Sequence, residues 1–126
     1  MALTKTIQID GQDVTFRASA AIPRIYRIKF GRDIYQDLNK LQAEVTQNEE
    51  GASFIEISSL EMFENIAYVM AKHADPTGVP DDINEWLDQF ETFSIYQILP
   101  EILTLWGANV ETQVESRKNF AAVSGK

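Results

Sequence analysis

The 126-residue chain contains no cysteine and a single histidine, and both scarcities restrict its chemistry. Without cysteine it forms no disulfide, has no thiolate nucleophile and offers no sulfur ligand to zinc. His73 precedes Asp75 near the end of a predicted helix, where the helix dipole favours a histidine. We therefore expect a structural role for His73, and we predict no catalytic residue, no metal site and no cofactor.

Long apolar runs and catalytic motifs are also missing. No stretch approaches the roughly 20 apolar residues that span a bilayer, and residues 1–10 lack the apolar region of a signal peptide. There is no Gly-rich phosphate loop, no GxSxG elbow and no HExxH motif. These absences predict a protein of the cytoplasm that is not an enzyme and has no membrane partner.

The chain does contain enough apolar sequence for one folded domain. Hydrophobic residues make up 44% and charged residues 24% of it, close to the values of ordinary globular proteins. After Glu111 the sequence becomes polar. We predict one globular domain over residues 1–110, and a polar, mobile C-terminal tail over residues 111–126.

Charge is distributed unevenly along the chain, whose net charge is −8. Residues 17–32 contain five basic side chains and no acidic one, whereas residues 44–115 contain fifteen acidic side chains and one basic one. This distribution favours head-to-tail association of a basic head with an acidic body, although an acidic surface can also serve only to keep a protein in solution. The candidate self-association residues are Arg24, Arg27, Arg32, Asp82, Glu85 and Asp88.

The N-terminal segment has the pattern of a β-hairpin. Polar and apolar residues alternate on either side of Asp10-Gly11, a dipeptide that tolerates the positive φ angles of a tight turn. The pattern predicts a hairpin over about residues 4–18. Because a lone hairpin is marginally stable in water, its apolar face must pack on other elements.

Helical periodicity predicts about five helices between residues 22 and 107. The first starts near Pro23 and ends at Gly31, and the second covers about residues 34–45. The third is expected to start in a capping box of Ser58 and Glu61, and its two apolar stripes predict a central, buried helix.

The last two helices are shorter or interrupted. The fourth is predicted to begin at Asp81 or Asp82, and the fifth follows a capping box of Ser94 and Gln97 and ends at Gly107. Pro100 lies inside the fifth helix and is expected to kink it. The predicted fold class is α+β, mainly α, with an N-terminal β-hairpin packed on a bundle of about five helices.

Four large apolar residues allow two interpretations. Flexible methionines and large aromatics suit adaptable binding surfaces, so they could line a groove that accepts apolar helical stripes of a client protein. The same spacing fits core positions, which is the interpretation we favour for each of them. The four residues are Met62, Met70, Trp86 and Trp106.

The basic stretch also raises the question of nucleic-acid binding. Arg24 and Arg27 share one helix face, but the acidic body would repel the phosphates that supply most such affinity. We therefore predict no nucleic-acid partner. The alternative function is an acidic regulator or decoy that binds a nucleic-acid-processing protein through the carboxylates of residues 81–91.

Three segments carry a resemblance to a known family. They are PRIYRIKFGRDIYQDL at residues 23–38, FENIAYVMAKHA at residues 63–74, and EWLDQF at residues 85–90 with its continuation to Trp106. In this order they resemble the tail assembly chaperones of long-tailed (siphovirus-type) phages and prophages of Gram-positive bacteria. The resemblance covers about residues 10–118, and residues 23–38 are its most specific part.

The resemblance implies a non-catalytic morphogenesis factor of the host cytoplasm that is absent from the mature virion. Such proteins bind and solubilise the tape measure protein and assist the assembly of tail tube subunits around it. The implied partners are the tape measure protein, the tail tube protein and further copies of the chain. In this family a ribosomal frameshift often yields a longer second product, and this chain would be the short form.

Overall fold

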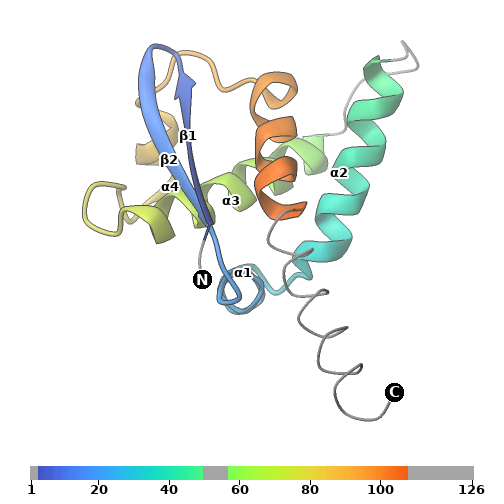
Figure 1. The fold of residues 1–126 in the computed structure, drawn as a ribbon, viewed down its shortest axis with the longest axis horizontal. Coiled ribbons are helices and arrows are strands. Elements are labelled where there is room, and N and C mark those ends of the chain that lie inside the picture. The colour runs from blue at the N-terminus through green and yellow to red at the C-terminus, as the bar shows by residue number, and fades with distance from the viewer. Residues whose placement is uncertain (1–2, 50–56, 108–126) are drawn as a thin grey trace, which may run out of the picture.

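The computed structural model describes residues 3–49 and 57–107, with side chains for residues 3–44 and 57–107. Within these ranges a two-stranded antiparallel hairpin is followed by five helices (Figure 1). The fold is therefore α+β and mainly α, which confirms the predicted class. The predicted tail over residues 111–126 lies outside the described residues.

The hairpin consists of β1 (Leu3–Ile9) and β2 (Gln12–Ala18), paired with Ile9 opposite Gln12. Asp10 has a φ of 53° and Gly11 a φ of 79°, so both turn residues take the positive φ that the tightest hairpin turns require. The predicted hairpin is thereby confirmed. Its buried face carries alternate apolar residues of both strands, namely Ile7, Ile9, Phe16 and Ala18.

The first two helices are joined by a short, sharply defined connection. Helix α1 (Ile22–Phe30) ends where Gly31 adopts a φ of 68° and donates its N–H to the carbonyl of Arg27 at 2.8 Å. Helix α2 (Ile34–Glu49) begins after Asp33, whose Oδ1 accepts the N–H of Tyr35 at 2.9 Å. These local signals explain why both boundaries follow from the sequence.

Helix α3 (Ile57–Ala74) is the central element of the fold. The strand β2 lies along it, and α1, α2 and α4 (Ile83–Leu87) also pack against it. Nine of its side chains are buried, as its two apolar stripes predicted. The predicted start is wrong by at least one residue, because Ile57 is already helical and Ser58 lies within the first turn.

The final helix covers residues 95–107 and lies between the hairpin and α2 (Figure 1). It begins after Ser94, whose carbonyl accepts the N–H groups of Gln97 and Ile98 at 3.2 and 3.0 Å. The Gln97 side chain donates to the carbonyl of Gln8 on β1 at 3.3 Å, so it fastens the hairpin and does not complete a capping box. Gly107 is the last described residue and is helical, so the predicted end of this helix lies at the boundary of the described residues and stays a prediction.

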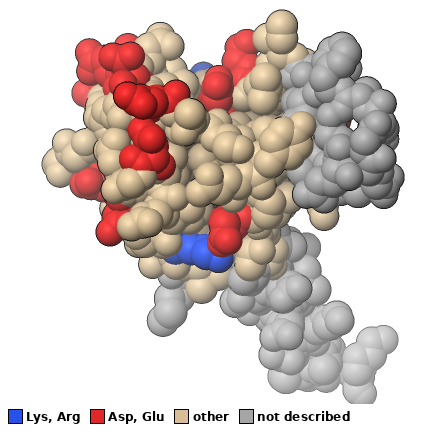
Figure 2. All heavy atoms as spheres, turned by 90° about the horizontal axis from the view of Figure 1, so that it is seen from above, with Lys and Arg blue, Asp and Glu red and all other residues tan. Residues whose placement is uncertain are grey.

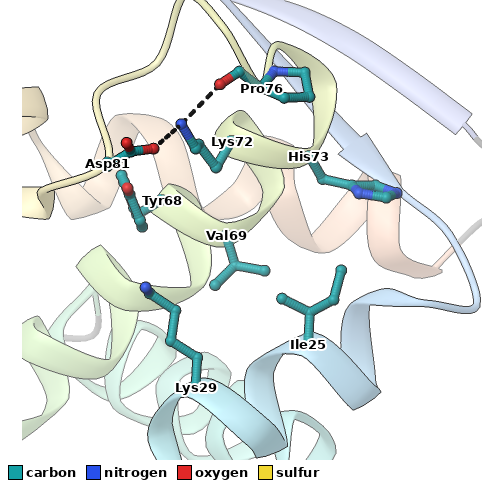
Figure 3. Close-up of a pocket in the computed structure, with 8 residues that line it drawn as sticks. All are labelled: Ile25, Lys29, Tyr68, Val69, Lys72, His73, Pro76 and Asp81. Carbon is teal, nitrogen blue, oxygen red and sulfur yellow. Dashed lines mark hydrogen bonds and ion pairs between the residues drawn. The ribbon is translucent and has the colours of Figure 1, made fainter.

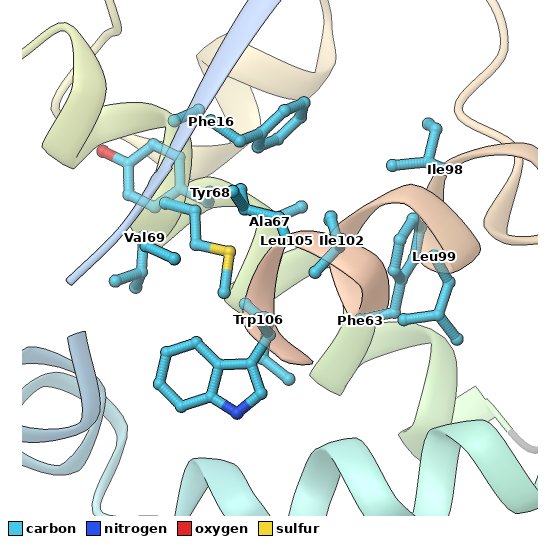
Figure 4. Packing of buried hydrophobic residues seen from close by; sticks show 14 of the residues in the cluster. Phe16, Phe63, Ala67, Tyr68, Val69, Ile98, Leu99, Ile102, Leu105 and Trp106 are labelled. Carbon is cyan, nitrogen blue, oxygen red and sulfur yellow. The ribbon is translucent and has the colours of Figure 1, made fainter. Parts of the chain in front are cut away.

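The core forms where β2, α3 and the helix of residues 95–107 meet (Figure 4). Phe16 of β2 lies against α3, and Ile98, Leu99 and Ile102 approach from the last helix. This packing supplies the apolar partner that the hairpin lacks by itself. It also leaves α1 at one end of α3, with one side of α1 facing outward.

Candidate protein-binding site

The four candidate groove residues are part of the core. Met62, Met70, Trp86 and Trp106 are each between 0 and 5% exposed. They are therefore core residues, as the favoured interpretation expects, although Met62, Trp86 and Trp106 each also border a surface hollow, so their part in a client groove stays a prediction. Met62 and Met70 are buried because α3 has neighbours on several sides, so both of its apolar stripes are covered.

Specific contacts hold three of these residues in place. The ring of Trp86 lies 5.6 Å from that of Tyr68, 5.6 Å from Phe90 and 5.3 Å from Phe93, centroid to centroid. Trp106 lies 5.6 Å from Tyr35 of α2. Met62 Sδ accepts an N–H of Arg32 at 3.3 Å. The contacts with Tyr68 and Tyr35 join separate helices, and the others join a helix to a neighbouring connecting segment, as expected of packing residues.

The candidate self-association residues divide into two groups. Arg24 and Arg27 are exposed on α1, and three carboxylates are exposed at and around α4, namely Asp82, Glu85 and Asp88. Figure 2 shows acidic side chains gathered on one face, with few basic ones among them. Within the described residues no ion pair joins the two groups, so the fold leaves both free for other contacts.

Arg32 differs from the other five candidates because it has partners in its own chain. Its Nε and Nη2 donate to the two oxygens of Asp37 at 2.8 Å each, and the hydroxyl of Tyr26 donates to Asp37 Oδ2 at 2.5 Å. The side chain of Asp37 is almost fully buried. Arg32 therefore joins α1 to α2 within the chain, and because its side chain is still 52% exposed its role in self-association stays a prediction.

Ionisation of this cluster follows from its contacts. Burial alone would raise the pKa of Asp37, but the hydrogen bonds from Arg32 and Tyr26 outweigh it and hold the pKa below its usual value. Burial, followed by the hydrogen bond to Asp37, raises the pKa of Tyr26. Asp37 is thus a stable carboxylate at neutral pH. All three residues lie in the segment of residues 23–38, so part of its distinctive sequence serves to join two helices.

The structure contains an open groove that the sequence did not predict, between α1 and the C-terminal half of α3 (Figure 3). It encloses about 440 Å³. Ile25 of α1 and Val69 of α3 point toward each other and form its floor, together with the side of the Tyr68 ring. Polar groups surround this floor, contributed by Lys29, Lys72, His73 and Asp81.

Lys72 closes one end of the groove through contacts within the chain. Its Nζ donates to the carbonyls of Pro76 and Val79 at 2.7 and 2.6 Å and to Asp81 Oδ1 at 2.7 Å. The hydrogen bond and the positive charge of Lys72 lower the pKa of Asp81. Lys72 and Asp81 therefore neutralise each other, and all three ammonium donors are used.

Lys29 has a different environment. Its Nζ lies 5.7 Å from the ring centroid of Tyr68 and 5.9 Å from that of Phe30, within range of cation–π attraction. Among the described residues it forms no ion pair. Lys29 therefore holds a defined position beside the apolar floor and leaves a positive charge available at the rim.

His73 lies at the other end of the groove (Figure 3). Its Nε2 is 3.1 Å from Ser19 Oγ, which also accepts the N–H of Ala21 at 3.3 Å. Burial and the charge of Arg17 lower the pKa of His73, so the imidazole is neutral at pH 7. The hydrogen bond links the end of β2 to α3.

Two other kinds of site concern metal ions and membranes. Across residues 3–44 and 57–107, no three histidine, aspartate or glutamate side chains are placed to hold a metal ion together. In the same part of the chain, no helix is long and apolar enough to cross a membrane.

Sequence reasoning missed the groove because its residues belong to two elements far apart in the chain. One signal was present in α1, whose core-facing stripe consists of the buried Ile22 and Tyr26 and the partly buried Phe30. Ile28 lies off this stripe and is 68% exposed. An isoleucine on the polar side of a short amphipathic helix indicates a second apolar surface.

Comparisons with known proteins give no assignment. No protein-family model, no curated protein and no solved structure matches the chain.

Proposed function

We propose that the chain is a phage tail assembly chaperone that binds and solubilises the tape measure protein and assists tail tube assembly. The observation that carries the proposal is the resemblance of three segments, in their order and amino-acid sequence, to that family. The segments are residues 23–38, 63–74 and 85–106. The groove between α1 and α3 supports it, because an open apolar floor with charged edges suits a protein partner.

The proposed action is binding without covalent chemistry. The ionisable groups that would be the first candidates for catalysis have structural partners: Asp37 with Arg32 and Tyr26, and His73 with Ser19. Lys72 likewise holds the loop that follows α3. These contacts stabilise the fold at the positions where an enzyme would need free acids or bases.

Co-expression tests the proposal directly. A fragment of the tape measure protein from the same phage or prophage would be produced with and without the chain, and its amount in the supernatant measured. The chain should raise that amount and co-purify with the fragment. A fragment of an unrelated aggregating protein is the control. No gain for the tape measure fragment would count against the chaperone function.

The proposal extends to the other partners and to location. The chain acts in the host cytoplasm, meets the tail tube protein through a longer frameshifted product, and is left out of the mature virion. Mass spectrometry of infected or induced cells should detect both products. Mass spectrometry of purified virions should detect neither product. Detection of the chain in virions at the level of a structural protein would contradict this part.

Self-association is proposed through the two exposed charged groups. Arg24 and Arg27 of one copy would meet Asp82, Glu85 and Asp88 of the next, because neither group is paired within the described part of its own chain. Contacts between unlike surfaces repeat from copy to copy, and they build rings or open chains. A long client would then be held at several points at once.

A further inference from the structure

We propose that the groove between α1 and α3 binds an acidic amphipathic helix of a partner protein, and that Ile28 extends the contact surface along α1. The inference rests on the proposed function only in naming the tape measure protein as the source of that helix. The chemistry of the groove can be tested without it.

The apolar part of the surface has the shape of a strip. Ile25 and Val69 form the groove floor, and Ile28 lies three residues beyond Ile25 on the same side of α1. Helix α1 has nine residues and is therefore about 14 Å long at 1.5 Å per residue. This length matches two to three turns of a bound helix with apolar anchors at i, i+4 and i+7.

Positive charges border the strip on both sides. At 3.6 residues per turn, the order around α1 is Arg24, Ile28, Ile25, Lys29, so the two cations enclose the two isoleucines. Lys72 and Asp81 cancel at the end of the groove. Among the described residues neither Lys29 nor Arg24 forms an ion pair, although the charge of Lys29 also acts on Asp81 across the groove.

Charge complementarity decides which occupant the surface fits. An acidic helix gains from both cations as its apolar anchors enter the groove, whereas a basic helix meets like charges on either side. The position of one cation on each side of the strip also sets the orientation of the partner, whose carboxylates must flank its apolar stripe.

The probe is a fluorescein-labelled helical peptide of 18 residues with leucines at i, i+4 and i+7 and glutamates beside them. A second peptide carries lysine in place of every glutamate. Fluorescence anisotropy at about 150 mM salt limits charge effects to short range. The acidic peptide should bind, and the lysine peptide should bind at least about tenfold more weakly.

Two pairs of variants locate the site. Lys29→Glu should weaken binding of the acidic peptide by about tenfold or more, whereas Arg27→Glu, the same charge change on the opposite side of α1, should change it by less than about threefold. Ile28→Asp should abolish measurable binding. Its control is Ile57→Asp, which alters an isoleucine that is 83% exposed at the start of α3.

Several outcomes would overturn the inference. These are equal binding of the two peptides, equal losses with Lys29→Glu and Arg27→Glu, or no loss with Ile28→Asp. NMR amide shifts at Ile25, Lys29 and Val69 on titration with the acidic peptide support it. Shifts confined to other elements, or self-association of the chain that fills the groove and excludes the peptide, reject it.

The tape measure co-expression experiment separates this inference from the proposed function. If the peptide binds as predicted but the tape measure fragment gains nothing from co-expression, the groove assignment stands and the chaperone function falls. If wild-type chain and Lys29→Glu solubilise the fragment equally, the function stands and the groove assignment falls. If the wild-type chain solubilises the fragment and Lys29→Glu does not, the result supports both the chaperone function and the groove assignment.

Discussion

At the scale of single residues, the most consequential contact is the one that surrounds Asp37. A buried carboxylate is costly unless hydrogen bonds replace its lost hydration. Here Tyr26 of α1 and Arg32 of the connection between α1 and α2 supply three hydrogen bonds to this carboxylate of α2. The carboxylate therefore fixes how α2 leaves α1.

Tyr26→Phe tests this contact with minimal change of shape. Removing the hydroxyl leaves Asp37 with one donor fewer in a buried place, and we expect the free energy of unfolding to fall by about 1–2 kcal/mol. Urea unfolding followed by circular dichroism measures it. Tyr96→Phe, at an exposed tyrosine, should change it by less than about 0.5 kcal/mol. Equal effects of the two variants would contradict the structural role.

His73 makes stability depend on pH. Its folded-state pKa lies below the ordinary value of 6.5, because burial and Arg17 disfavour the charged imidazole. The unfolded chain therefore takes up the proton first as the pH falls. The stabilising contribution of neutral His73 is complete above the unfolded pKa and is lost between the unfolded and folded pKa values.

We accordingly expect wild-type chain to lose stability between about pH 7.5 and pH 5.5, and His73→Asn to lose less over the same interval. Urea unfolding of both proteins at the two pH values measures the difference. The pKa of Asp37 is also lowered, so its stabilising contribution is complete over this interval and is lost only as the pH falls below its ordinary value of 3.8. Parallel pH dependence of the two proteins would show that another group is responsible.

At the scale of elements, the hairpin depends on its turn and on fastening by distant residues. Asp10 Oδ2 accepts the N–H of Glu91 at 2.9 Å, and the Gln12 side chain donates to the carbonyl of Gln89 at 2.8 Å. Lys5 forms an ion pair with Glu101. The hairpin is thus held by the segment before the last helix and by that helix itself.

Two glycine substitutions separate backbone conformation from side-chain contact. Gly11 and Gly107 both have open space around an added Cβ, but only Gly11 has a positive φ, of 79°. Gly11→Ala should lower the free energy of unfolding by about 1 kcal/mol. Gly107→Ala, in a helix, should leave it unchanged or raise it by up to about 1 kcal/mol. Thermal unfolding compares them, and a loss at both positions would contradict the argument.

Helix α4 has five residues and cannot be stable by helix propensity alone. It is held by Trp86, which enters the aromatic cluster of Tyr68, Phe90 and Phe93. Trp86→Ala should lower the free energy of unfolding by about 3–5 kcal/mol through the cavity it leaves. Ile28→Ala, at an exposed position, is the control and should have little effect. A Trp86→Ala protein that keeps its stability but no longer binds the client would show that Trp86 contacts the client.

At the scale of the whole molecule, the uneven charge distribution predicts assembly. The double variant Arg24→Glu and Arg27→Glu should reduce the sedimentation coefficient to that of a monomer, and the triple reversal of Asp82, Glu85 and Asp88 to Lys should do the same. Combining the two sets should restore association, because the charges are again complementary. Arg32→Glu is excluded from the test since it breaks the contact with Asp37. Wild-type monomers under all conditions would remove this proposal.

The sequence determined the local structure of this protein. Asp10-Gly11 specified the turn, Gly31 ended α1, and the two apolar stripes of α3 identified the central helix, because these depend on backbone conformation and on periodicity within one segment. It also limited the chemistry, through the absence of cysteine.

Only the tertiary structure decided which side chains are available to a partner. Trp86 and Met70 are buried while Ile28 is exposed, although all three are large apolar residues at helical positions. Arg32 is paired with Asp37 while Lys29, three residues earlier, is not. The reason is that exposure and pairing depend on which elements meet, and the groove exists only because α1 lies against one end of α3.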